Sequence, residues 1–150
     1  MMTTQEKYMK EALKEAKKAL AIDEVPIGCV IVKDGKIIAR GHNERETKQD
    51  STSHAELKTL QKACKKLKSW RLVGCDIYVT LEPCIMCAGA IIQSRIDNVY
   101  FGAYDLKGGA FGTSINVLDA KNINHKPNIV GGVLEDACSQ LLKDFFKNKR

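Results

Sequence analysis

Two short segments of this chain carry side chains that could act together in metal-dependent chemistry. The first is His54-Ala55-Glu56, which combines an imidazole with a carboxylate, and the second is Pro83-Cys84-Ile85-Met86-Cys87, which carries two thiols. We expect Pro83 to occupy the first position of a helix, where its missing N–H costs nothing. At a spacing of i, i+3 the two thiols would then share one face of the first turn, where the helix N-terminus favours thiolates.

A zinc ion is the metal that these residue types suit best. One His and two Cys give three ligands of the softness that zinc prefers, and three protein ligands leave the fourth tetrahedral position open, as in catalytic sites. Water bound at such a position has a pKa of roughly 7. Glu56 lies too close to His54 in sequence to share its direction fully, so it suits a proton carrier better than a fourth ligand. A Cys-x-x-Cys pair alone is also common in structural zinc sites, and that alternative stays open here.

Hydrophobic periodicity predicts the elements that must position these segments. Apolar residues at helical spacing predict a helix over residues 3–20, and a second helix carrying His54 and Glu56 is expected to be capped by Thr52 or Ser53. A β-hairpin over 27–41, strands over 76–81 and 97–102 on either side of the cysteine helix, a glycine-rich loop over 103–113, a short edge strand at 129–130 and a helix over 135–147 complete the prediction.

A hairpin followed by strand–helix–strand units predicts an α/β sandwich around a mixed sheet. The 150 residues suit a single domain over 1–150, and 44% hydrophobic with 28% charged residues is ordinary for a globular protein. No apolar run approaches membrane-spanning length, and the polar start is unlike a signal peptide. We therefore expect a cytoplasmic protein that does not associate with membranes. Thiols stay reduced in that compartment, and four of them are interpreted as core or subsurface residues: Cys29, Cys64, Cys75 and Cys138.

The positive charge is unevenly distributed along the chain. The formal net charge is +6, yet residues 57–75 contain no acid at all. The basic residues of that segment are Lys58, Lys62, Lys65, Lys66, Lys68 and Arg71, and those of the tail are Lys143, Lys147, Lys149 and Arg150. Phosphate binding and simple solubility explain these two segments equally well at this point.

The two chemical segments together resemble the H-x-E…P-C-x-x-C signature of zinc nucleoside and nucleotide deaminases. The similarity to bacterial tRNA-specific adenosine deaminases extends over nearly the full length. Further matching segments are Val25-Pro26-Ile27-Gly28, Thr80-Leu81-Glu82, Ala88-Gly89-Ala90-Ile91, Ser94-Arg95-Ile96 and Phe101-Gly102-Ala103 with Asp105, Lys107, Gly109 and Ala110.

This resemblance implies a three-layer α/β/α cytidine-deaminase-like fold with a five-stranded mixed sheet, one Zn²⁺ per chain, no organic cofactor and a homodimer. It implies hydrolytic conversion of the wobble adenosine of a tRNA anticodon to inosine, with the anticodon stem-loop as partner and an arginine tRNA (ACG anticodon) as the expected substrate.

The resemblance also implies a role for each matching residue. His54, Cys84 and Cys87 would hold the zinc, and Glu56 would move protons between water, the purine and the leaving ammonia. Asn43 would hydrogen-bond the purine, because an amide offers both a donor and an acceptor. Asp105 would contact a ribose or a neighbouring nucleotide at the pocket rim; its alternative role is that of a turn residue.

Two other functions compete with this one. A small-molecule deaminase of the same fold would act on guanine, cytosine or a deoxycytidylate; the His first ligand disfavours the small cytidine deaminases, which use Cys there. A non-catalytic zinc module would merely bind RNA, but it would have no use for an unligated Glu56 beside the ion.

Overall fold

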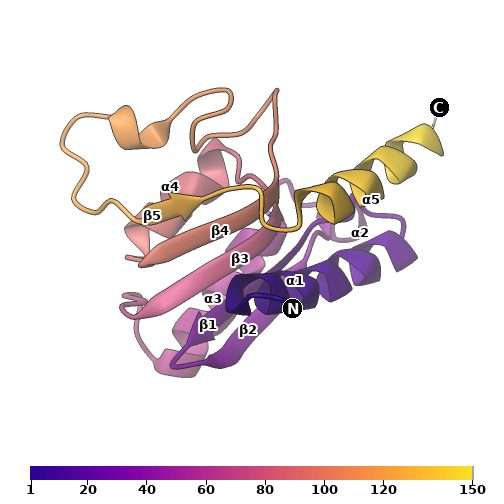
Figure 1. The fold of residues 1–150 in the computed structure, drawn as a ribbon. Helices are drawn as coiled ribbons and strands as arrows, with labels where there is room; N and C mark the ends of the chain where they lie inside the picture. Colours follow the sequence, from indigo (N-terminus) through magenta and orange to yellow (C-terminus); the bar gives the residue numbers. More distant parts are fainter. Residues whose placement is uncertain (150) are drawn as a thin grey trace.

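A mixed sheet of five strands forms the middle layer of the molecule (Figure 1). The computed structural model describes residues 1–149, so Arg150 of the basic tail lies outside the described residues. The strands are β1 (Gly28–Lys33), β2 (Lys36–His42), β3 (Cys75–Leu81), β4 (Asn98–Ala103) and β5 (Asn128–Val130), in the order β2-β1-β3-β4-β5. β1 pairs antiparallel with β2 and β3, whereas β3, β4 and β5 run parallel.

Helices cover both faces of this sheet. The helices are α1 (Thr4–Ala21), α2 (Arg45–Lys48), α3 (Ala55–Leu67), α4 (Ile85–Gln93) and α5 (Glu135–Lys147), with a 3₁₀ turn η1 (Val117–Asp119). Figure 1 shows α1 and α5 on one face and α3 and α4 on the other. The expected three-layer α/β/α fold with a five-stranded mixed sheet is therefore confirmed.

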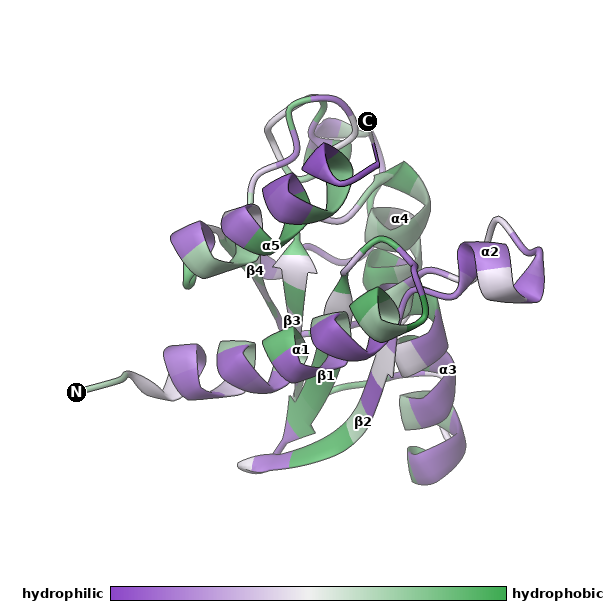
Figure 2. Ribbon diagram, turned by 90° about the vertical axis from the view of Figure 1, so that its right-hand side faces the viewer, coloured by the Kyte–Doolittle hydropathy of each residue, from purple (hydrophilic) through white to green (hydrophobic). Residues whose placement is uncertain are grey.

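Each face of the sheet has its own hydrophobic core. Successive side chains of a strand point to opposite faces, so Ile31 of β1 packs with Leu60 and Ile91 beneath α3 and α4. Its neighbour Val30 packs with Met9 of α1 and Leu142 of α5 on the other side. Figure 2 shows the apolar strands enclosed between helices whose outer faces are mostly hydrophilic, except for α4. β1 and β3 are buried on both faces, which is why their sequences read as nearly continuous apolar runs.

The boundaries differ from the sequence predictions in a few places. The short helix α2 lies between β2 and α3, where the sequence predicted neither a helix nor a strand. In the part of the chain that the structure describes, no helix combines the length and the apolar character needed to cross a bilayer.

Gly28 shows why the start of β1 requires a glycine. A Cβ atom at this position would overlap the backbone of α1 at Ala12 and Ala16. The absence of a side chain therefore allows α1 to cross directly over β1. The backbone N–H of Gly28 donates to Thr80 Oγ1 at 3.1 Å, which connects this point to the end of β3.

Candidate metal centre and active site

The N-termini of α3 and α4 face one another and carry the predicted metal ligands. His54 is the N-cap of α3 and Cys84 is the N-cap of α4, and both have extended backbone conformations. Cys87 follows in the first turn of α4. An N-cap residue has left the helical path, so its side chain can reach across to the opposing helix.

Two capping predictions were wrong. Thr52 and Ser53 do not cap α3, because both side-chain hydroxyls hydrogen-bond to the carboxylate of Asp50 instead. Pro83 is not the first helical residue either, because the helix begins at Ile85, after Cys84 as N-cap. Both ligand-bearing helices therefore start one or two residues later than the sequence suggested.

The three ligand atoms have the spacing that a tetrahedral metal site needs. The His54 Nδ1 atom lies 3.5 Å from Cys87 Sγ and 3.7 Å from Cys84 Sγ. All three ligand atoms lie within 4.8 Å of one another, as in a group that could hold a metal ion. Tetrahedral zinc bonded at about 2.3 Å to sulfur and about 2.0 Å to nitrogen places such atoms about 3.5 Å apart. We call these three residues the ligand cluster, and their donor set and spacing fit zinc.

Glu56 lies in the first turn of α3 beside the ligand cluster. Its side chain is 4% exposed, and Oε1 is buried without a hydrogen-bond partner among the described residues. Burial, together with the negative charge of Cys84, raises the pKa of Glu56 to about 7. A buried carboxylate oxygen without a hydrogen-bond partner destabilises a fold. Such an arrangement is expected where the carboxylate has to bind and release a proton during a reaction.

The two thiols of the ligand cluster have pKa values shifted in opposite directions. The hydrogen bond from Cys87, followed by that from His54, lowers the pKa of Cys84 to about 3. The same bond and burial raise the pKa of Cys87 far above its usual value. A cation placed between them would favour the thiolate form of both.

Asn43 directly follows β2 and reaches the same helix start. Its Oδ1 accepts a hydrogen bond of 2.8 Å from the backbone N–H of Ala55. This N–H is one of the helix-start donors without an intrahelical partner, and the side chain of the N-cap residue His54 makes no capping hydrogen bond. The Asn43 side chain thus fixes the start of α3. The amide nitrogen of Asn43 makes no hydrogen bond to the described residues and is left to donate elsewhere.

Asp105 lies in the glycine-rich loop (residues 103–113) that follows β4. Its Oδ1 accepts hydrogen bonds from the backbone N–H groups of Lys107 and Gly108, both at 3.1 Å. This is the geometry of a side chain that stabilises its own turn. The side chain of Asp105 is only partly buried, so it remains accessible at the rim.

Two buried carboxylates near this site were missed by sequence reasoning. Glu24 accepts hydrogen bonds from the backbone of Glu46 and Thr47, at 3.2 Å and 2.6 Å, and so fixes the segment between Asn43 and His54. Glu82 accepts backbone hydrogen bonds from the glycine-rich loop. Glu82 gave a signal in the sequence, because it directly precedes Pro83 and is the one charged residue between Asp76 and Arg95. Glu24 follows another acid, Asp23, and gave no comparable signal.

Comparison with known proteins agrees with this geometry. Residues 3–150 match the family of MafB19-like deaminases. The chain belongs to this family. Two relatives are tRNA-specific adenosine deaminases. That of Bacillus subtilis is 55% identical over 99% of this chain and 92% of its own length, and that of Aquifex aeolicus is 46% identical over 97% and 95%. The protein is therefore a deaminase.

Solved structures give the same result. A tRNA:A34 deaminase, from work on A-to-I editing at the wobble position of transfer RNA, is 44% identical with a TM-score of 0.86 and covers 89% of this chain and 97% of that chain. The guanine deaminase of Bacillus subtilis is 33% identical with a TM-score of 0.63, over 77% of this chain and 85% of that chain. The fold thus serves both tRNA and free-base deaminases.

We expect the deaminase to bind a single zinc ion per chain through the ligand cluster. Replacing Cys87 with Ala removes a direct ligand and should weaken zinc binding by more than the roughly 10- to 100-fold seen when an outer-shell partner is lost. Competition with a chromogenic chelator measures this affinity. Cys75→Ala is the matched control, because Cys75 is equally buried but lies at the start of β3. Equal zinc affinity of the two variants would contradict the assignment.

Proposed function

We propose that this deaminase converts the wobble adenosine of a tRNA anticodon to inosine, with zinc held by His54, Cys84 and Cys87. The observation that carries the proposal is the buried Oε1 of Glu56, which has no hydrogen-bond partner within residues 1–149 and lies beside a three-residue ligand cluster. The 55% identity to a tRNA-specific adenosine deaminase supports the choice of substrate. An arginine tRNA with an ACG anticodon is the proposed substrate.

Glu56 is the proposed proton carrier. The reaction adds water at C6 of the adenine and releases ammonia, so one proton must move from water to the ring N1 and another to the leaving amino group. Bound zinc supplies Lewis-acid activation of the water. Glu56 accepts the first water proton at its carboxylate and delivers it to N1. It then takes the second proton from the new hydroxyl group on C6 and gives it to the amino nitrogen, so that ammonia leaves as the C6 carbonyl forms. Burial, which brings its pKa to about 7, suits a group that alternates between both states near neutral pH.

Asn43 and Asp105 are the proposed substrate contacts. The Oδ1 of Asn43 is occupied by the N–H of Ala55, so the amide would serve the purine as a donor through its nitrogen. Asp105, partly exposed on the glycine-rich loop, would contact a ribose or a neighbouring nucleotide. An anticodon loop is already partly unstacked, so its wobble base leaves the stack at little cost.

A surface hollow at the end of α1 suits single-stranded RNA. The hollow has a volume of about 600 Å³ and lies between the end of α1, α2 and α5; Phe146 is exposed there, and the exposed Lys149 pairs with Asp23 at 2.6 Å. Aromatic faces stack bases and a lysine pairs with phosphate. Within the acid-free segment, residues 65–71 lie at and beyond the C-terminal end of α3, whose 13 residues span about 20 Å, so they lie farther from the ligand cluster. We therefore assign phosphate contacts near the wobble base to the tail rather than to residues 65–71.

The proposed substrate also implies a cytoplasmic location, which cell fractionation would test.

We further propose a homodimer that forms through α3 and α4. A groove of about 440 Å³ runs between these helices, and Ile85 of α4 is 63% exposed. Its lining residues are Leu57, Leu60, Gln61, Cys64, Lys65, Ala90 and Ser94. Figure 2 shows that α4 is hydrophobic along most of its length. An apolar surface of this kind is typical of subunit interfaces.

The experiment that tests the proposed activity measures inosine formation at the wobble position of an unmodified arginine tRNA (ACG) transcript. Free adenosine, cytidine and guanine are parallel substrates for the same zinc-loaded protein. We expect turnover on the transcript alone. Turnover on guanine or cytidine, with none on the transcript, would assign the protein to the small-molecule deaminases instead.

Glu56→Gln is the companion variant in this assay. The amide keeps the size of the side chain but cannot carry the proton, so kcat should fall by at least the roughly 100-fold that general acid–base catalysis contributes. Zinc content should stay unchanged, because Glu56 is not a ligand. A variant that retains activity, or that loses its zinc, would contradict the role of proton carrier.

The dimer proposal predicts the effect of a charge in the α3–α4 groove. Ala90→Glu should convert a dimer into a monomer in sedimentation-velocity experiments, because the carboxylate cannot be buried unpaired at the interface. Val73→Glu is the control, since Val73 is 61% exposed before β3 and does not line the groove. A monomeric wild type, or an Ala90→Glu variant that remains dimeric, would disprove this interface.

A further inference from the structure

Glu82 is a buried anion whose role the reaction does not explain. It follows β3 directly and precedes Pro83 and the ligand Cys84. Its side chain is only 2% exposed, and no Lys, Arg or His lies within ion-pair distance of it among residues 1–149. A buried carboxylate without a cation needs hydrogen-bond donors to offset the loss of water.

Three backbone N–H groups of the glycine-rich loop supply these hydrogen bonds. Oε1 accepts from Asp105 at 3.2 Å, and Oε2 accepts from Phe111 at 3.1 Å and from Thr113 at 3.2 Å. Hydrogen bonds to a charged acceptor are roughly twice as strong as those between neutral groups. The donors come from the beginning and the end of the loop, so the Glu82 side chain binds both ends of the loop.

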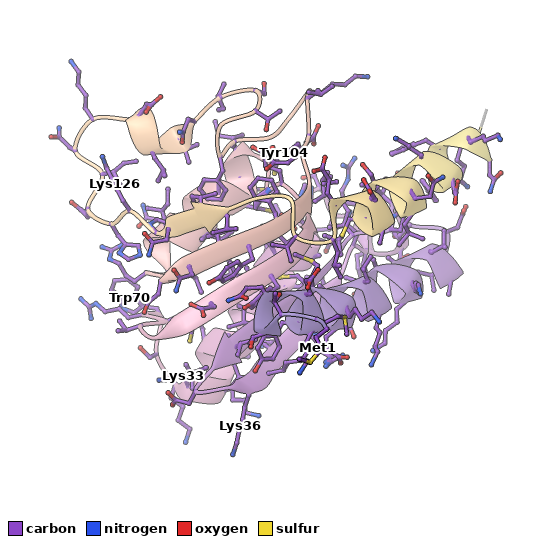
Figure 3. The ribbon with its side chains drawn as sticks, viewed as in Figure 1. Met1, Lys33, Lys36, Trp70, Tyr104 and Lys126 are labelled. Carbon is purple, nitrogen blue, oxygen red and sulfur yellow. The ribbon has the colours of Figure 1, made fainter. Side chains whose placement is uncertain are left out.

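The backbone around Glu82 strengthens the same attachment. Its N–H donates to Ala103 O at 2.8 Å, and the N–H of Ala110 donates to Pro83 O at 2.9 Å. A Cβ atom on Gly109 would overlap the Glu82 carboxylate, so only glycine allows the loop to approach this closely. Figure 3 shows Tyr104, at the start of the loop, beyond the end of β4 and far from Trp70 at the other end of the sheet.

We propose that Glu82 is a positioning residue for the substrate. The short segment 82–84 contributes Cys84 to the ligand cluster. Two residues before Cys84, the Glu82 carboxylate of the same segment binds the backbone of the glycine-rich loop. The position of Asp105 at the rim is thereby fixed relative to the metal ligands. This inference rests on the proposed function, because it assigns the loop to binding of the nucleotides around the target adenosine. It predicts that Glu82 affects substrate binding rather than the chemical step.

Glu82→Gln tests this role. The replacement amide group would point its own N–H at a backbone N–H, so hydrogen bonds at one end of the loop are lost while the size of the side chain is kept. We expect KM for the tRNA transcript to rise about tenfold and kcat to stay within about threefold, as for loss of binding without loss of chemistry. Zinc content should not change.

Glu15→Gln is the matched control for the destabilisation that any buried Glu-to-Gln change can cause. Glu15 is also 2% exposed, but it pairs with Lys18 at 2.7 Å and Arg40 at 3.2 Å between α1 and β2. This control should lower the melting temperature without raising KM. If both variants shift KM equally, or if Glu82→Gln lowers only kcat, the positioning role is wrong.

Two further measurements do not depend on the folding of Glu82→Gln, and the second does not depend on the identity of the substrate either. Gly109→Ala pushes a methyl group against the Glu82 carboxylate and should reproduce the rise in KM. Hydrogen exchange of the wild type without RNA should show protected amides at Asp105, Phe111 and Thr113. Exchange of these amides at the rate of exposed ones would overturn the proposal even if the transcript is a substrate. Protected amides with no turnover of RNA would overturn the proposed function alone.

Discussion

The structure depends on one geometric constraint, which is that the N-termini of α3 and α4 must meet within a few ångströms. The three ligand atoms come from these two helix starts, and none comes from a strand. Both helices begin at the same end of the sheet. The chain reaches α3 after the end of β2 and α4 after the end of β3. Because β1 pairs with both of these strands, their ends are held at a fixed separation. The sheet therefore acts as the spacer that sets the distance between His54 and Cys84.

Buried carboxylates stabilise the loops around the two helix N-termini. Glu24 binds the backbone before α3, and Glu82 binds the backbone after β4, and each is 2% exposed. Loops carry most binding residues in enzymes but are also the most mobile segments. A carboxylate that accepts several backbone N–H groups orders such a loop without covering its outer surface. Glu56 differs from both, because its buried Oε1 has no partner in the described chain. This contrast separates the carboxylates that support the site from the one that we propose takes part in the reaction.

The sequence predicted which side chains meet at the site better than it predicted their local geometry. Cys84, Cys87, His54 and Glu56 could be found because a metal restricts both residue type and spacing. The three-layer fold was also predictable, since strand and helix periods are local properties of the chain. The caps were not, because Thr52 and Ser53 are strong N-cap residues whose hydroxyls bond to Asp50 instead. The role of Glu82 could not be foreseen either, since its hydrogen-bond donors lie 23 to 31 residues away along the chain.

The most direct test of this account is X-ray absorption spectroscopy of the zinc-loaded protein. The ligand cluster predicts two sulfur atoms at about 2.3 Å and two lighter atoms at about 2.0 Å, one from His54 and one from solvent. The Glu56→Gln variant should give the same spectrum, because Glu56 lies beside the ion without binding it. A shell of three or four sulfurs would show that another cysteine completes a closed structural site. A changed spectrum in the variant would show that Glu56 is a ligand, and either result would contradict the proposed catalytic centre.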